Sequence, residues 1–172
     1  MKTITAFASS KNGLEEIYYT QTNRLMNLLD PEKITLVYGG GHIGIMACIR
    51  TFTGKVISSN LYKFADSLLP KDDYLFETIE ERQHKMVEMG EMYLILPGGY
   101  GTHYEALEVM TKNDIGQTNK PIFMLNVNGI FDLFLQHIDD LNKKGFLQNV
   151  SFLYFYVSSD PEELAQMIHK HC

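Results

Sequence analysis

The chain has 172 residues, of which 45% are apolar, and its formal net charge at pH 7 is −6. The length favours a single domain, 1–172, with a full core, and the negative charge argues against a nucleic-acid partner, which requires a basic stripe. Cys48 and Cys172 form no redox or metal-binding spacing, so a reducing cytoplasm is the expected location. The opening MKTITAFASS is too short and polar for a signal peptide, and no run approaches the roughly 20 apolar residues of a membrane span.

Short apolar runs alternate with longer amphipathic segments. The runs predict strands near residues 3–8, 34–39, 55–59, 74–78, 92–96, 121–126 and 152–157. The amphipathic segments predict helices near residues 14–29, 43–52, 80–90, 102–115, 130–144 and 161–170. The segment 60–73 is ambiguous between a loop and a short helix.

Three of these strands, ITLVY, MYLIL and PIFML, are nearly continuous apolar runs. Such runs are typical of parallel strands that helices cover on both faces. The alternation of strands and helices therefore predicts an α/β fold with a doubly wound, mostly parallel sheet flanked by helices. In sheets of this kind, ligands bind at the carboxyl ends of the strands.

Two glycine-rich turns each follow a predicted strand and precede a predicted helix. The first lies in LVYGGGHIGIM, residues 36–46, and the second in LILPGGYGTHYE, residues 94–105. Glycine permits a sharp turn and lets an anion approach the backbone N–H groups, and a helix N-terminus adds unpaired N–H groups and positive partial charge. Two such turns predict a cleft for a phosphorylated ligand. The candidate binding residues in them are Gly40, Gly41, Gly98, Gly99, Gly101 and Thr102.

The first turn has three possible interpretations. Gly39, Gly41 and Gly44 have the GxGxxG spacing of dinucleotide-binding proteins. About 20 residues further on, where an acid should meet the ribose, the chain reads Ser58-Ser59-Asn60, so NAD binding is disfavoured. A tight turn with close helix packing, or a cradle for a mononucleotide or sugar phosphate, remains open.

The second turn ends in an acid, Glu105, which has two interpretations. Thr102-x-x-Glu105 has the spacing of a capping box, and a carboxylate beside a phosphate cradle also suits chemistry on a phosphorylated molecule. Glu108 lies one turn later on nearly the same face, and two such carboxylates repel unless a base is near or a proton is shared. The candidate counter-charge is Arg82, which could otherwise be a solvated surface arginine.

The remaining candidates are histidines and serines. His42 and His103 lie within the two turns and could line the cleft, but their spacing predicts no metal site. Ser9 and Ser10 end the first strand, where they could hydrogen-bond a ligand or cap the next helix.

PGGYGTHYE, residues 97–105, matches the PGGxGTxxE motif of the Lonely Guy (LOG) family, cytokinin riboside 5′-monophosphate phosphoribohydrolases often labelled lysine decarboxylases. The sequence YGGG at 38–41, with Gly44 and Met46, resembles the family's YGGGxxGxM. LNVNG at 125–129 resembles its LLNVDG, and KGF at 144–146 resembles its EGF. The resemblance covers nearly the whole chain, and PGGxGTxxE is specific to this family and its close nucleotide-binding relatives.

The resemblance implies a Rossmann-like fold, a homodimer and a nucleoside 5′-monophosphate substrate, cleaved by water to free base and ribose 5-phosphate without a metal or redox cofactor. The family's essential arginine and glutamate correspond to Arg82 and Glu105. Glu105 would stabilise an oxocarbenium-like state and accept a proton from water, and its place near a helix N-terminus is expected to keep it ionised. The backbone of 98–102 would hold the phosphate, with Glu108 in a supporting place.

The chain also departs from the family pattern. The MHxRK segment around the arginine reads IEERQ at 79–83, and the opening FCGSS is reduced to FASS at 7–10. Lys112 and Asp114 stand where the family often has Trp and Gln. These changes leave base specificity open. The alternative function is a non-catalytic carrier of a nucleotide or molybdopterin-type cofactor, and the retention of Arg82 and Glu105 favours the enzyme.

Overall fold

A computed structural model describes residues 1–65, 72–148 and 154–172 of the chain. Within these ranges, seven strands form one parallel sheet in the order β4-β3-β2-β1-β5-β6-β7. Their bounds are β1 Lys2–Phe7, β2 Ile34–Tyr38, β3 Lys55–Leu61, β4 Tyr74–Phe76, β5 Met92–Ile95, β6 Ile122–Leu125 and β7 Phe155–Ser158. Each corresponds to a predicted strand, although residues 152 and 153 of the last prediction lie outside the described residues.

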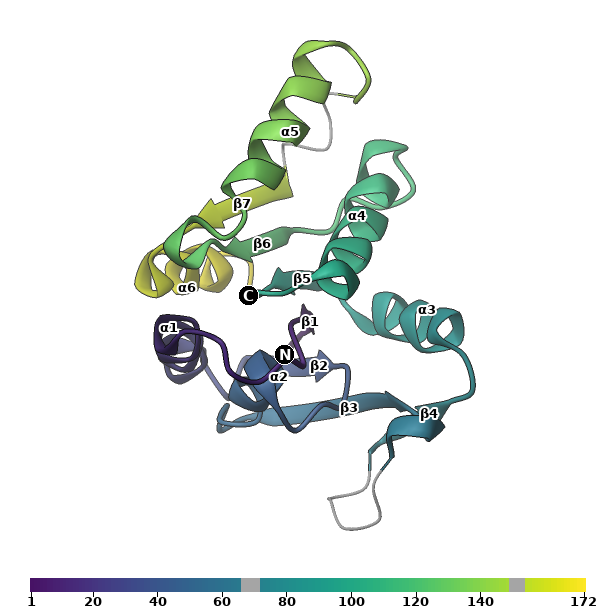
Figure 1. Ribbon diagram of the computed structural model, residues 1–172, viewed down its shortest axis with the longest axis vertical. Helices are drawn as coiled ribbons and strands as arrows, with labels where there is room; N and C mark the ends of the chain where they lie inside the picture. Colours follow the sequence, from purple (N-terminus) through teal and green to yellow (C-terminus); the bar gives the residue numbers. More distant parts are fainter. Residues whose placement is uncertain (66–71, 149–153) are drawn as a thin grey trace.

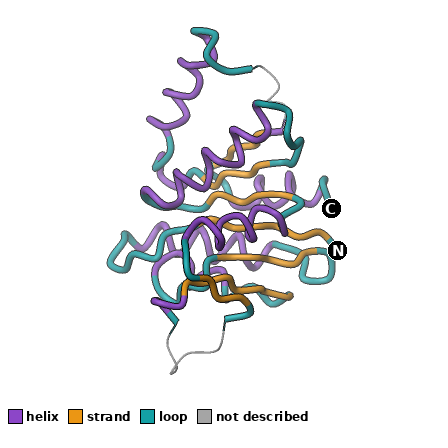
Figure 2. Tube along the Cα trace, turned by 90° about the vertical axis from the view of Figure 1, so that its right-hand side faces the viewer, coloured by secondary structure: helices purple, strands orange, loops and turns teal. Residues whose placement is uncertain are grey.

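Helices cover both faces of this sheet (Figures 1 and 2). They are α1 Glu16–Leu28, α2 Gly44–Ile49, α3 Ile79–Met89, α4 Tyr100–Asp114, α5 Asp132–Lys143 and α6 Pro161–His169, with short 3₁₀ turns η1 Tyr62–Phe64 and η2 Val127–Gly129. The predicted α/β, doubly wound architecture is confirmed. The ambiguous segment 60–73 contains the end of β3 and η1, and its residues 66–71 are not described.

The alternation of side chains along each buried strand builds two cores. Leu36 and Tyr38 of β2 pack with α1, α2 and α6 on one face. Val37 of the same strand packs with α3 and α4 on the other. Every residue of β2, β5 and β6 is buried, as expected for parallel strands covered on both sides.

The strand order reverses beside β1, which pairs with β2 on one side and β5 on the other. The crevice outside the carboxyl ends of the strands at such a reversal is the usual ligand site of open α/β sheets. The glycine-rich turns follow β2 and β5, so they flank the end of β1. Ser9, just beyond β1, ties them together: its N–H donates to Pro97 O at 3.1 Å, and its carbonyl accepts from Met46 N at 3.0 Å. In the described ranges, no helix has the length and apolar character needed to cross a bilayer.

Candidate functional site

An ion pair joins the helices that follow β4 and β5. Arg82 in the first turn of α3 donates from Nη2 to Glu105 Oε1 of α4 at 3.2 Å. Both residues are buried, with 9% and 6% of their surface exposed. Arg82 is therefore not a solvated surface arginine. Exposed ion pairs contribute little to stability, whereas an arginine buried beside a carboxylate is held by the surrounding fold.

A capping box fixes the start of α3 and hence the position of Arg82. Thr78 Oγ1 accepts from Glu81 N at 3.2 Å, and Glu81 Oε2 accepts from Thr78 N at 3.3 Å. The sequence analysis missed this Thr-x-x-Glu pattern and left a capping box at Thr102 and Glu105 as one of two interpretations of Glu105. The structure excludes that capping box, because α4 begins two residues before Thr102 and puts Glu105 in its second turn. The Glu105 carboxylate therefore points towards Arg82 instead of the helix start.

Burial dominates the electrostatics of Glu105. Loss of water raises the pKa of this carboxyl to about 7; the nearby Arg82 opposes the rise, and Glu108 adds to it. The helix N-terminus was expected to favour the ionised form of Glu105, and burial in the second turn acts in the opposite direction. With a pKa near neutrality, the carboxyl can both release and accept a proton at physiological pH.

A cleft of about 400 Å³ opens beside Arg82, at the carboxyl ends of β2 and β3. Its volume lies in the range of roughly 300–1,000 Å³ that is usual for small-molecule sites. The cleft is lined by Ser10, Gly39, Gly40, Gly41, His42, Ile43, Met46, Asn60, Phe64 and Arg82. Residues of the first turn thus line the cleft directly, whereas the second turn is connected to the cleft through the Arg82–Glu105 pair. Sequence reasoning missed Asn60 and Phe64, although the end of a third parallel strand could have drawn attention to Asn60.

The guanidinium of Arg82 also lies against the first turn. A Cβ on Gly39 would stand 2.5 Å from Arg82 Nη2, closer than real side chains approach. Glycine at this position therefore lets Arg82 contact both the first turn and Glu105. Arg82 Nε is buried and has no hydrogen-bond partner among the described residues, which leaves one donor of the guanidinium uncommitted.

The helix start after the first turn has little capacity for an anion. Two N–H groups there are already used: Gly44 donates to Asn12 Oδ1 at 3.1 Å and Met46 to Ser9 O. The carboxylate of Asp72 lies close behind the turn, since a Cβ on Gly40 would stand 2.6 Å from Asp72 Oδ1. Of the interpretations left open by the sequence, the geometry favours a tight turn with close packing, whose surface suits an uncharged part of a ligand.

The second turn offers an open helix N-terminus. It starts the 15-residue α4, and within the described ranges no side chain caps Gly99. A Cβ on Gly99 or Gly101 would meet no heavy atom of the described structure within 4 Å. The first N–H groups of a helix have no intrahelical partner, so this turn presents unpaired donors and positive partial charge to an incoming anion. Gly98 is packed against the buried Thr102 side chain.

Three predicted site residues lie elsewhere or serve the fold. His103 contacts Gly99 O through Nδ1 at 2.8 Å, and its ring packs on Phe131 and Phe134, so it does not line the cleft. Ser9 Oγ accepts from Lys11 N at 3.0 Å and does not cap α1, which begins at Glu16. Glu108 is paired with Lys112 at 2.6 Å.

Residues 31–168 match the family model described as "Possible lysine decarboxylase". The chain is 30% identical over 179 residues to cytokinin riboside 5′-monophosphate phosphoribohydrolase LOG7 of Arabidopsis thaliana, covering 99% of this chain and 82% of that protein. It is 34% identical over 158 residues to the probable phosphoribohydrolase LOG6 of the same plant, covering 85% and 77%.

Solved structures share the fold at lower sequence identity. The X-ray structure of the structural genomics target TM1055 superposes with a TM-score of 0.71 at 18% identity, covering 99% of both chains. The molybdenum cofactor binding protein of Rippkaea orientalis superposes with a TM-score of 0.63 at 17% identity, covering 98% of this chain and 94% of that one. At these identities the likeness concerns the fold alone.

Proposed function

Since this chain belongs to the LOG family, whose model is described as possible lysine decarboxylase, we propose that it is a nucleotide phosphoribohydrolase. It hydrolyses the N-glycosidic bond of a nucleoside 5′-monophosphate, AMP-like or a cytokinin nucleotide, to free base and ribose 5-phosphate. The relatives named as phosphoribohydrolases support this activity. The observation that carries the proposal is the buried Arg82–Glu105 pair between the two glycine turns.

Glu105 and Arg82 have different roles in the proposed reaction. Cleavage of an N-glycosidic bond places positive charge on the ribose in an oxocarbenium-like transition state. The Glu105 carboxylate stabilises that charge and accepts a proton from the water that attacks C1′. As the bond to the base breaks, its electron pair moves to the base nitrogen, where Arg82 stabilises the negative charge. The base then takes up a proton to become the free base, and Glu105 releases the proton that it accepted from water.

The substrate spans the two turns. Its phosphate binds the open N-terminus of α4, at the backbone of 98–102, where unpaired N–H groups and the helix dipole favour an anion. Its base enters the cleft beside the first turn, whose walls include the apolar side chains of Ile43, Met46 and Phe64. This arrangement places the bond to be cleaved near Arg82 and Glu105, and the bound phosphate contributes the positioning that hydrolysis requires.

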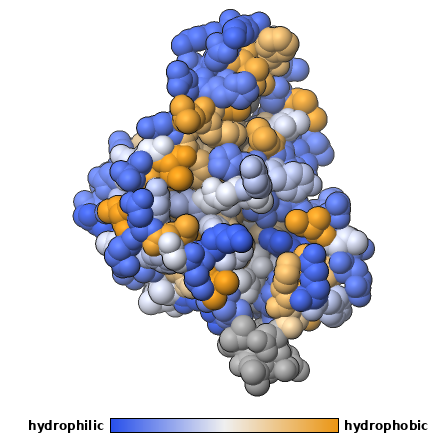
Figure 3. All heavy atoms as spheres, in the orientation of Figure 1, coloured by the Kyte–Doolittle hydropathy of each residue, from blue (hydrophilic) through white to orange (hydrophobic). Residues whose placement is uncertain are grey.

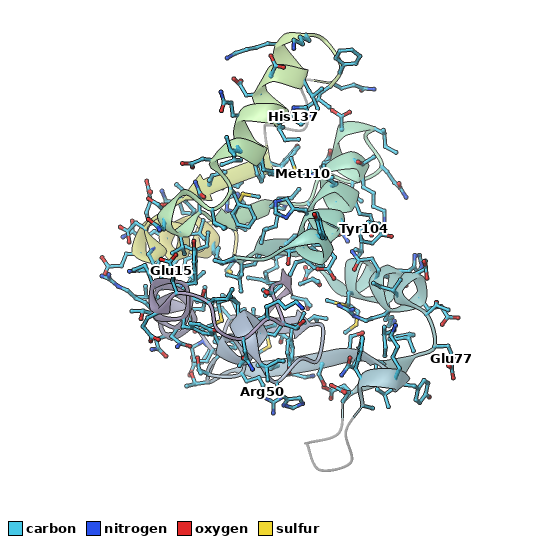
Figure 4. All side chains as sticks on the ribbon, in the orientation of Figure 1. Glu15, Arg50, Glu77, Tyr104, Met110 and His137 are labelled. Atoms are coloured by element: carbon cyan, nitrogen blue, oxygen red, sulfur yellow. The ribbon has the colours of Figure 1, made fainter. Side chains whose placement is uncertain are left out.

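The active unit in this proposal is a homodimer that packs through α4. The outer face of α4 exposes Tyr100, Tyr104 and Leu107, with 98%, 50% and 44% of their surface accessible, and Ile115, directly after the helix, is 59% exposed. Tyr104 lies at the surface of α4 (Figure 4), and hydrophobic residues gather between α4 and α5 on the surface in Figure 3. A second copy of the chain would cover this face.

A carrier function without hydrolysis is the second candidate. It rests on structural neighbours named as molybdenum cofactor carriers, which share the fold at 15–18% identity. The buried acid and arginine favour hydrolysis, since binding alone does not require a carboxylate whose pKa lies near neutrality.

The deciding experiment incubates AMP, GMP, CMP and isopentenyl-AMP separately with the protein, and follows release of free base by chromatography. We expect hydrolysis of at least one purine nucleotide, and loss of that activity in Glu105→Gln and Arg82→Ala. If base is released from none of these nucleotides at high protein concentration while one of them binds tightly, the carrier function replaces the enzyme.

A further inference from the structure

The acid of the candidate site is the first member of a row of charges along α4. Glu105 and Glu108 are three residues apart, and Glu108 and Lys112 are four apart, so all three lie on one face of the helix. Lys112 Nζ lies 2.6 Å from Glu108 Oε1, with 21% and 23% of the two side chains exposed. This pair is better shielded from water than a typical surface ion pair.

Glu108 depends on Lys112 as its cation. Its other oxygen, Oε2, is buried and has no hydrogen-bond partner in the described part of the chain. Burial of a carboxylate oxygen without a hydrogen bond is costly, and a neighbouring positive charge offsets that cost. Lys112 supplies that charge, and it does so from the side of Glu108 that is further from Glu105.

The other charged and titratable groups around this row come from neighbouring elements. Arg82 of α3 is the direct partner of Glu105. Tyr93 of β5 donates its hydroxyl to Val87 O at 3.0 Å, and Lys120 Nζ lies 5.6 Å from the Tyr93 ring. Burial and the nearby Lys112 both lower the pKa of Lys120. In the described structure, Glu105 therefore has Arg82 on one side and Glu108 on the other.

We propose that Lys112 is a positioning residue for Glu105: by neutralising Glu108, it favours the ionised form of the Glu105 carboxyl when substrate binds. Lys112 stands where the LOG pattern often has Trp, so the resemblance to the family does not itself imply this ion pair. The consequence for turnover rests on the proposed function, whereas the charge coupling itself does not.

The coupling predicts opposite effects for its two members. Replacing Lys112 by Met leaves the Glu108 charge without a partner, which disfavours a second charge on Glu105 and shifts its titration to higher pH. Replacing Glu108 by Gln removes the repulsion and shifts the titration to lower pH. At the separation of neighbouring helical turns, we expect each shift to be about 0.5–1 pH unit.

The test titrates Glu105 by ¹³C NMR of carboxyl-labelled glutamate in the full chain without substrate, with Glu105→Gln to assign the signal. We expect Lys112→Met to raise the midpoint, Lys112→Arg to preserve it, and Glu108→Gln to lower it. The double variant, Glu108→Gln with Lys112→Met, should behave like Glu108→Gln alone. Lys143→Met is the matched control, because Lys143 pairs with Asp139 at the same helical spacing on α5.

An unchanged midpoint in Lys112→Met, or a shift of equal size in the Glu108→Gln background, would overturn the proposal. If Lys112→Met does not fold, Glu108→Gln alone tests the coupling. A Glu105 titration midpoint that does not fall in this variant contradicts the proposal. Where hydrolysis is measurable, the acid limb of the kcat/KM profile should move with the NMR midpoint. A protein that releases no base but shows these shifts would refute the proposed function and retain the coupling.

Discussion

Arg82 Nη2 and Glu105 Oε1 lie 3.2 Å apart, although 23 positions separate the two residues in the sequence. The contact connects α3 with α4, and because Arg82 also lies against Gly39, it connects the two glycine turns. The guanidinium has a single hydrogen bond to the carboxylate and a buried Nε without a partner among the described residues. The pair therefore has the features of a site held ready for a ligand, and its chemistry can be tested by substitution.

The first prediction concerns Glu105→Gln. The amide keeps the side-chain size but can neither carry negative charge nor accept a proton. We expect kcat to fall by roughly 10² or more, the scale for a lost acid–base group, with little loss of stability. The measurement compares kcat and the free energy of unfolding of the two proteins. A variant with near-normal kcat would remove Glu105 from the mechanism.

The second prediction concerns the pH dependence of stability. The pKa of Glu105 is about 7 in the folded protein, against an ordinary value of 4.5. Between these values the folded state binds the proton more tightly than the unfolded chain does. The contribution of Glu105 to stability is thus present at low pH and is lost, by roughly 2–4 kcal/mol, as pH rises to about 7.

Denaturant unfolding of the parent protein and of Glu105→Gln across this range isolates that contribution. The variant has no titrating group at this position, so its stability relative to the parent should rise steadily with pH. A constant difference would mean that the folded Glu105 titrates at its ordinary pKa.

The third prediction concerns Gly39→Ala. The new methyl group would stand 2.5 Å from Arg82 Nη2 and must displace the guanidinium. We expect a cost of about 1–3 kcal/mol in stability and a loss of activity comparable to that of Arg82→Ala. Gly13→Ala controls for the general effect of replacing a glycine, since it lies far from the pair in open space, although its positive φ adds strain. Full activity in Gly39→Ala would separate the first turn from the placement of Arg82.

The fourth prediction concerns the phosphate. Because the open N-terminus of α4 positions the substrate in the proposed function, AMP should be hydrolysed much faster than adenosine. Steady-state kinetics with both compounds measures the difference, and inorganic phosphate should compete with the nucleotide. Equal turnover of AMP and adenosine would contradict the placement of the phosphate at residues 98–102.

The fifth prediction concerns assembly. Light scattering at micromolar concentration should give the mass of a dimer, and Leu107→Glu should shift it towards the monomer, because it places a charge on the apolar face of α4. Ile17→Glu on α1 is the control, since Ile17 has similar exposure, 38% against 44%. A monomeric parent protein would count against the dimer.

Much of the fold could be predicted from the sequence because its signals are local. The apolar runs of β2, β5 and β6 reflect burial on both faces, and the structure confirms it. The two glycine turns could likewise be predicted from the spacing of their glycines. Helix starts were harder to predict, because Thr102-x-x-Glu105 and Thr78-x-x-Glu81 have the same pattern, and only the tertiary structure decides which one forms a cap.

The candidate site was less predictable because it depends on contacts between distant segments. The sequence around Arg82 is that of a solvated helix, and its burial arises only from the packing of α3 beside the first turn. Both glycine turns were expected to cradle phosphate, yet after the first turn the N–H groups of Gly44 and Met46 already donate to Asn12 and Ser9. Local composition shows which backbone segments can bind an anion. It does not show whether their N–H groups already donate to other groups of the protein.

The central position of β1 has a consequence for how the protein acquires activity. The strand pairs with β2 nearby in sequence, but its pairing with β5 joins segments as distant as Lys2 and Glu91, 89 positions apart. Closing so long a loop costs conformational entropy before the contacts between β1 and β5 can form and offset it. Sheets with such long-range strand pairing fold slowly. The two glycine turns lie on either side of the end of β1. During refolding, catalytic activity should therefore return only when β1 pairs with β5, which is later than helix formation.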